Sequence, residues 1–244
     1  PFAVLLCTAC SKNERGSGAS PGADSGADSG AECSGSGAAE VRQCVSRPRL
    51  EADLQFVAQP LAPGSPHWQA VQDLCKSRFE QYGLTVELHT YPGGVNVIGT
   101  RAGTTHPGEH VLVSAHYDHI AGCAGADDNA TGVVALLETA RVTQGKSFPR
   151  TLALACWDQE EDGLLGVKAY ALRARQNDES IVVMYSLEML GFKTTAPDTQ
   201  SVPAGIDILF PEQYAELQAA GFVGDFLTII ADTPAMKAGA RVAA

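Results

Sequence analysis

A polar cluster between two apolar runs constrains this chain more than any other feature of its sequence. The apolar run 110–115 ends in His-Tyr-Asp at 116–118. A short Gly/Ala/Cys segment then leads to Gly-Ala-Asp-Asp-Asn at 125–129, before a second apolar run begins at Val133. This order predicts a strand, a polar turn and then a helix. Because open α/β sheets build their sites outside the carboxyl ends of strands, we expect chemistry here.

Two later segments repeat this arrangement. The apolar run Thr151–Trp157 ends in the acidic segment 158–162, and the run Ile181–Leu187 ends in Glu188. If the three strands are parallel neighbours, their terminal side chains meet in one cleft: His116, Asp128, Glu160, Glu161 and Glu188. Carboxylates gathered in this way repel one another unless a cation neutralises them. The pattern therefore predicts a metal site.

Strands and helices alternate along the chain, which predicts an α/β fold: a doubly wound, mostly parallel sheet flanked by helices, in a single domain. The expected helices are 49–61, 65–82, 130–140, 163–175 and 211–220. The expected strands are 85–91 at the outside of the sheet, 93–100, 110–115, 151–157, 181–187 and 225–231. Ser65 and Pro66 suit the start of the helix expected at 65–82. Asp128 or Asn129 can cap the helix expected at 130–140. We expect a loop at 106–108 and no regular element at 232–244.

Composition limits the possible partners. The chain has 244 residues, of which 45% are hydrophobic, enough for one α/β core, and its net charge of −11 argues against a nucleic-acid partner. No run is long and apolar enough to cross a bilayer as a mature helix. A membrane is therefore expected to be a partner only through a lipid anchor.

The N-terminal region carries an export signal in this interpretation. Residues 1–10 resemble the end of a bacterial lipoprotein signal, in which Cys10 becomes the acylated N-terminal residue; Cys7 departs from the usual leucine. An ordinary signal peptide and a chance apolar terminus are the alternatives. Residues 11–40 are expected to be a disordered Gly/Ser/Ala/Asp tether, and residues 41–244 a catalytic domain. We expect a protein exported to the periplasm or cell exterior, and a sequence truncated at both ends.

Seven cysteines also suit an oxidising compartment. Cys44 with Cys75, and Cys123 with Cys156, are the expected pairs, because each pair brackets a compact unit. Alternatively, Cys156 is an isolated buried thiol within its strand.

The polar residues can be given roles from their chemistry. His116 can bind a metal through one ring nitrogen while Asp118 helps to set the surrounding network, and Asp128 can bridge two ions. In the pair Glu160-Glu161, one carboxylate can take a metal while the other accepts a proton from water. Nitrogen and oxygen ligands with an open position suit zinc best, although cobalt or manganese can occupy such a site.

Four sequence blocks, AHYDHI, GADDNATG, WDQEEDGLLGVKAYA and SLEMLGF, are similar to blocks of the co-catalytic zinc aminopeptidases, the bacterial leucyl aminopeptidase and aminopeptidase Y group. The similarity runs from about Val95 to Phe192 and more weakly to Ala231. The resemblance implies that the protein hydrolyses the N-terminal bond of a peptide or small aminoacyl substrate, with Glu160 as general base. It also implies two zinc ions, one bound by His116, Asp128 and Glu188 and the other by Asp128 and Glu161.

This chain departs from the family pattern at two positions. Many relatives carry Asp where this chain has Glu188, and relatives supply a last zinc ligand, a histidine, from beyond the expected strand 225–231. No histidine follows His119 in this chain. We therefore expect zinc to occupy the His116, Asp128 and Glu188 site in preference to the site left with two carboxylates.

Other functions fit the same pattern. A same-fold dipeptidase or a single-zinc glutaminyl cyclase is the alternative among enzymes, and a non-catalytic receptor-like ectodomain is the alternative outside them. The pair Glu160-Glu161 argues against the ectodomain, which has no need of an unligated base. A calcium-only loop is disfavoured because His116 is a poor ligand for a hard cation.

Overall fold

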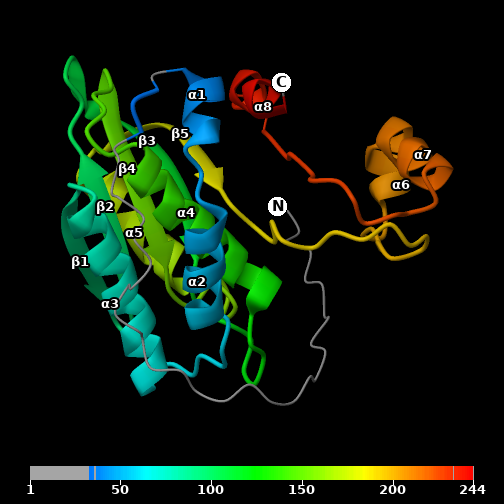
Figure 1. Ribbon diagram of the computed structural model, residues 1–244, viewed down its shortest axis with the longest axis horizontal. Helices are drawn as coiled ribbons and strands as arrows, with labels where there is room; N and C mark the ends of the chain where they lie inside the picture. The colour runs from blue at the N-terminus through cyan, green and yellow to red at the C-terminus, as the bar shows by residue number, and fades with distance from the viewer. Residues whose placement is uncertain (1–32, 36, 233, 244) are drawn as a thin grey trace. The chain divides into compact units, whose positions relative to one another are not determined.

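The structure is a computed structural model that describes residues 33–35, 37–232 and 234–243. The chain divides into two compact units, which comprise residues 33–189 and 190–243 of its described part (Figure 1). The larger unit contains the sheet and every predicted metal-site residue.

The larger unit is built on one five-stranded sheet. Its strands are β1 (Thr85–Tyr91), β2 (Gly94–Arg101), β3 (His106–His116), β4 (Arg150–Trp157) and β5 (Ser180–Ser186), in the order β1-β2-β4-β3-β5. Strand β3 pairs in parallel with β4 and β5, whereas β2 runs antiparallel to both β1 and β4. Four strands therefore point the same way, and the predicted α/β class and the three parallel neighbours are confirmed.

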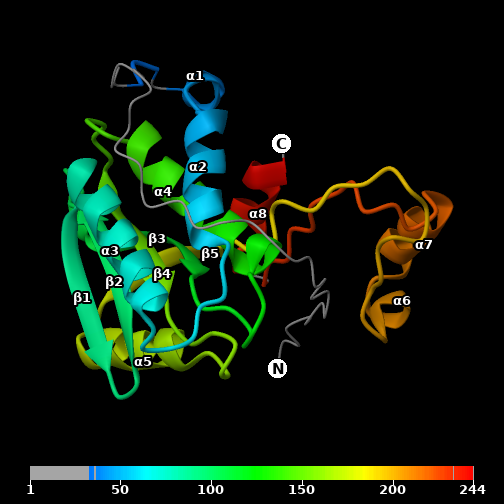
Figure 2. The same cartoon turned by 60° about the horizontal axis from the view of Figure 1, so that its bottom comes forward.

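Helices cover both faces of the sheet (Figure 2). The helices of this unit are α1 (Ala38–Gln43), α2 (Arg47–Val57), α3 (Pro66–Gln81), α4 (Gly132–Val142) and α5 (Leu165–Gln176). Helices α2, α3 and α4 enclose the larger core, and α5 encloses a smaller core on the opposite face, where Tyr170 packs beside Trp157 and Leu112. This arrangement is the predicted doubly wound core.

Side chains accept backbone hydrogen bonds at the starts of two helices. Ser65 Oγ accepts a hydrogen bond from the amide of Trp68 at 3.1 Å, and Pro66 occupies the first helical position of α3, as predicted. At the start of α4, Asn129 Oδ1 accepts from the Gly132 amide at 3.1 Å. The N-cap position of α4 is Thr131, so Asn129 satisfies the first helical amide from two residues before the cap, and the Asp128 carboxylate stays available for other contacts.

The predicted loop at 106–108 is wrong. Strand β3 begins at His106, which pairs with Arg150, and the pairing is irregular up to His110. The amide of His106 donates to the Pro149 carbonyl at 2.8 Å. Pro149, which directly precedes β4, thus supplies a hydrogen-bond partner for His106. Pro107, which lacks an amide hydrogen, lies in the irregular part of the pairing.

The smaller unit contains α6 (Ile206–Leu209), α7 (Pro211–Ala219) and α8 (Met236–Ala243). The helix expected at 211–220 is confirmed, but the strand expected at 225–231 is wrong. A strand needs a neighbour to take its backbone hydrogen bonds, and no described residue pairs with this segment. Helix α8 lies where no element was expected, because its good helix formers outweigh the interior Gly239.

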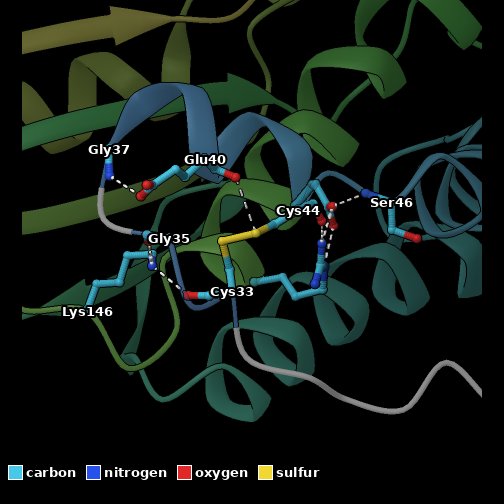
Figure 3. The surroundings of a disulfide bond; sticks show 9 residues. Cys33, Gly35, Gly37, Glu40, Cys44, Ser46 and Lys146 are labelled. Atoms are coloured by element: carbon cyan, nitrogen blue, oxygen red, sulfur yellow. Dashed lines mark hydrogen bonds and ion pairs between the residues drawn. A yellow bond between two sulfur atoms is a disulfide. The ribbon is translucent and has the colours of Figure 1, made fainter.

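The predicted cysteine pairs are also wrong. Cys44 is bonded to Cys33 (Figure 3). Cys75 and Cys156 are buried free thiols. Sequence spacing did not predict the pairing, because Cys75 faces the larger core from α3 and lies among apolar side chains there. The alternative expectation for Cys156, a buried thiol within its strand, is the one that holds.

Four polar contacts fasten the disulfide-linked segment to the end of α4 and the turn after it (Figure 3). Lys146 Nζ donates to the carbonyls of Cys33, at 2.7 Å, and Gly35. Arg141 donates to the Cys44 carbonyl, and Glu138 Oε1 accepts from the Ser46 amide at 2.6 Å. Described structure therefore begins before the predicted domain start at residue 41.

The predicted signal at 1–10, with Cys10, and most of the predicted tether lie outside the described residues. No helix in the described part of the chain has the length and apolar character needed to cross a membrane.

Candidate metal centre and active site

The parallel register brings the three predicted polar segments together. His116 at the end of β3 lies opposite Trp157 at the end of β4, and Ser114 lies opposite Ser186 at the end of β5. The segments that follow these strands therefore leave the sheet at one edge, where Glu160, Glu161 and Glu188 join His116 and Asp128, as the sequence predicted.

His116 is buried at the centre of the site, with 2% of its surface exposed. Its Nδ1 donates to the Asp118 carbonyl at 3.0 Å, and its Nε2 lies 3.1 Å from Asp128 Oδ1 and 3.3 Å from Glu188 Oε2. Burial lowers the pKa of His116, but the carboxylates of Asp118, Asp128 and Glu188 outweigh burial and raise it well above the usual value. The site thus attracts positive charge at Nε2.

Asp118 connects His116 to the paired glutamates. Its buried carboxylate accepts hydrogen bonds from the amides of Glu160, at 2.9 Å, and Glu161, at 3.0 Å, and Asp118 Oδ1 lies 3.4 Å from His116 Nδ1. One carboxylate therefore fixes both the imidazole and the turn after β4. This geometry agrees with the network role predicted for Asp118.

The paired glutamates have environments that favour their neutral forms. Burial, followed by the charge of Asp128, raises the pKa of Glu161 to about 7. Burial also raises the pKa of Glu160, partly offset by His116. Glu161 Oε1 is buried and has no hydrogen-bond partner among the described residues. An orphaned carboxylate oxygen of this kind is expected where a cation binds.

A metal ion fits these residues. His116, Asp128 and Glu161 each offer one ligand atom, and these atoms all lie within 4.8 Å of one another. Zinc bonds nitrogen and oxygen ligands at about 2.0–2.2 Å, so only small movements are needed to close the three atoms around an ion. An imidazole with two carboxylates is also a donor set suited to zinc.

Glu188 approaches the site from the edge strand β5. It contacts His116 but does not belong to the compact group of three, and its side chain is 45% exposed. Asn129 holds it in place: Asn129 Nδ2 donates to Glu188 Oε2 at 2.6 Å and to the Leu187 carbonyl at 2.7 Å. The Asp128–Asn129 peptide bond is cis. The sequence suggested Asn129 only as a helix cap, although its position directly after Asp128 signalled a place at the site.

A second buried carboxylate, which the sequence did not single out, supports the turn after β4. Asp158 is fully buried and accepts hydrogen bonds from Trp68 Nε1, at 3.1 Å, and the Val95 amide, at 3.0 Å. Burial raises its pKa, and these donors partly offset the effect. Because the donors come from α3 and β2, distant in sequence, spacing alone could not identify this network.

Comparison with known proteins gives the same assignment. The sequence model of peptidase family M28 matches residues 96–222, just over half of the chain. The uncharacterized protein YfbL of Escherichia coli strain K12 is 28% identical over 202 residues, which are 75% of this chain and 58% of that protein. Leucine aminopeptidase 1 of Ajellomyces capsulatus strain NAm1 / WU24 is 32% identical over 125 residues, which are 45% of this chain and 32% of that protein.

Solved structures share the fold. LapB from Legionella pneumophila superposes with a TM-score of 0.58 and 21% sequence identity, over 72% of this chain and 54% of that chain. The present chain therefore spans between 32% and 58% of the length of these three relatives.

Proposed function

This chain belongs to peptidase family M28, and on that premise we propose that it is the catalytic part of a zinc-dependent aminopeptidase. One observation carries the proposal. His116, Asp128 and Glu161 present ligand atoms at one point, and the adjacent Glu160 has a carboxylate that accepts no hydrogen bond from the described residues. A site that only bound a metal would not need this additional free carboxylate.

The ligand set proposed for zinc follows the positions of these side chains. Asp128, His116 and Glu188 would hold one ion, and Asp128 with Glu161 would hold the other. The contacts of His116 Nε2 with Asp128 and Glu188 support the first group, and the closeness of Glu161 to Asp128 supports the second. When bound, zinc would polarise the scissile carbonyl and lower the pKa of a water molecule.

Each nearby residue has a task in this reaction. Glu160 accepts a proton from the attacking water and delivers it to the leaving amine, and its raised pKa suits both transfers. Asp118 holds the Glu160 amide and the His116 imidazole in one arrangement, so that base and ligand keep their relative positions. The surrounding carboxylates also suit the free ammonium group of a peptide or small aminoacyl substrate.

The test combines zinc content with turnover on a panel of aminoacyl, dipeptide and N-terminal glutamine substrates, in the natural full-length gene product. We expect aminoacyl hydrolysis in the unaltered protein. Glu160→Ala should reduce turnover by about 10²–10⁴-fold or more while bound zinc stays nearly unchanged, whereas the matched Glu161→Ala should lose zinc. The reverse pattern would exchange the two roles. Cyclisation of N-terminal glutamine without peptide hydrolysis would instead identify a glutaminyl cyclase.

We further propose that the protein is exported and attached to a bacterial membrane through lipid on Cys10, with residues 11–40 as a spacer. The Cys33–Cys44 disulfide supports export, because such bonds persist in oxidising compartments. Mass spectrometry of the mature N-terminus should find acylated Cys10. An unmodified N-terminus downstream of Cys10 would contradict the anchor.

A further inference from the structure

His119 lies in the loop after β3 and has no role in the chemistry described above. Only 4% of its surface is exposed, and its Nδ1 lies 3.0 Å from the carbonyl oxygen of Gln59. Because a carbonyl can only accept a hydrogen bond, Nδ1 carries the hydrogen. Nε2 is buried and has no hydrogen-bond partner among the described residues. Burial lowers the pKa of His119 to about 4, which keeps the ring neutral.

On its other side, the His119 imidazole contacts the backbone of Gly125. Gly125 has a φ of 58°, and a Cβ at this position would lie 2.2 Å from the Cγ and Cδ2 atoms of His119. The imidazole thus fills the space that any other residue at 125 would need for its side chain. Glycine is required here for two reasons, the left-handed backbone and the close approach of the ring.

Gly125 begins the turn that carries Asp128. Its carbonyl accepts a hydrogen bond from the Ala130 amide at 2.9 Å, which closes the turn Ala126–Thr131. Helix α2, which ends two residues before Gln59, also packs against this turn. His119 therefore lies between the chain that leaves α2 and the first residue of the Asp128 turn.

The far end of the same turn is fixed separately. Asn129 accepts hydrogen bonds from the amides of Gly132 and Met189 and donates to the Leu187 carbonyl. The Asp128 carboxylate is thus placed between two attachments, Asn129 on one side and the contact between His119 and Gly125 on the other. Loss of either attachment should release Asp128 from His116 Nε2, which lies 3.1 Å away.

We propose that His119 is a positioning residue of the metal site: its buried imidazole joins the Gln59 carbonyl to the Gly125 backbone and thereby holds the Asp128 carboxylate in place for a metal ion. The proposal rests on the zinc site proposed above and concerns its geometry alone. His119 acts through Asp128 and contacts neither metal nor substrate.

Two carboxamide substitutions, each of which matches one ring nitrogen, separate this role from others. The side-chain nitrogen of asparagine can take the place of Nδ1 and donate to Gln59, whereas that of glutamine reaches the place of Nε2 and cannot. Zinc is titrated into the metal-free full chain by calorimetry, with a thermal melt of each variant. His119→Gln should weaken zinc binding by about 10–100-fold, the range for residues that orient ligands, and His119→Asn should restore most of the loss.

Gly125→Ala tests the same contact from the other side and leaves the imidazole intact. It should weaken zinc binding to a similar degree, because the new methyl group collides with the ring. In a His119→Ala background, Gly125→Ala should cost less, since no ring remains; this non-additivity is the signature of direct contact.

The outcomes are distinct. A lower melting temperature with unchanged zinc affinity in His119→Gln and Gly125→Ala would overturn the proposal, because it would show a purely structural role. Equal losses in His119→Asn and His119→Gln, with an altered visible spectrum of the cobalt-substituted protein, would make His119 a ligand and also overturn it. If His119→Gln does not fold, Gly125→Ala decides; if neither melts cooperatively, the contact serves folding and the proposal fails. An unaltered chain that binds no zinc would refute the proposed function instead.

Discussion

The centre and the edge of the sheet differ sharply in burial. Every residue of β4 from Thr151 to Trp157 is buried, whereas exposed and half-buried residues alternate along β5. Strand β4 has a strand on each side and a core on each face, while β5 lies at the end of the described sheet and pairs with β3 alone. Sequence composition hides this difference, because both strands are short apolar runs.

The proposed metal site draws on both regions. His116 leaves the sheet centre with 2% of its surface exposed, whereas Glu188 follows the edge strand with a side chain that is 45% exposed. His116 is held by Asp118 and by close packing, and Glu188 by the side chains of Asn129 and Ser186. We infer that the central half of the site is preformed and that the edge half is adjustable, and three measurements test this contrast.

Amide hydrogen exchange should show the largest difference. The amides of β4 should exchange only through global unfolding, whereas those of β5 should exchange through local opening and therefore faster by orders of magnitude. Exchange followed by mass spectrometry or NMR at neutral pH measures both strands in one experiment. Equal protection in β4 and β5 would show that the edge is covered and would remove the contrast.

Truncation of side chains should follow the same order. Leu154→Ala in β4 should lower the free energy of unfolding by about 3 kcal/mol, because it leaves a cavity in the large core. Met184→Ala in β5, where the residue is 42% exposed, should lower it by less than about 1 kcal/mol. Urea unfolding of both variants is the measurement, and similar losses would place Met184 in a packed interface.

Zinc affinity should show the smallest difference. His116→Ala should weaken zinc binding by about 100-fold or more, equivalent to about 2.7 kcal/mol, whereas Glu188→Ala should weaken it by about tenfold, or about 1.4 kcal/mol. The reason is that an adjustable carboxylate can be replaced by water at lower cost than a preformed imidazole. Calorimetric titration of the metal-free variants gives both values. A larger loss for Glu188→Ala would make the edge strand the main metal anchor.

The central elements could be predicted because their local signals agree with their surroundings. Strand β1 was predicted with its observed bounds, and α3 from its Ser65-Pro66 start, since alternation and capping are local properties. The smaller unit could not be predicted in the same way. Leu227 and Ile230 suggested a strand, yet both are exposed, and among described residues 190–241 only Gly224 is buried. An apolar run specifies a strand only when the fold provides it with a neighbour.

The site divides along the same principle. His116, Glu160 and Glu188 could be predicted because each follows an apolar strand, and parallel strands end at one edge. The contacts that hold these residues could not be predicted, because they join distant segments: Asn129 reaches Leu187, and His119 reaches Gln59. The Cys33–Cys44 bond escaped prediction because Cys33 lies in a stretch whose composition suggested a tether.

The Cys33–Cys44 disulfide bond also affects where a force applied to the N-terminal side of the chain acts on the larger unit. The segment that this bond closes is fastened near the carboxyl end of α4 by Arg141 and Lys146, whereas the turn that carries Asp128 precedes Gly132 at the amino end. The eleven residues of α4 separate these ends by about 16 Å. We expect a force applied before Cys33 to act on the disulfide and on the contacts of Arg141 and Lys146, and not on the turn that carries Asp128. Immobilisation on a solid support through the N-terminal side should accordingly leave zinc affinity unchanged while the disulfide is intact.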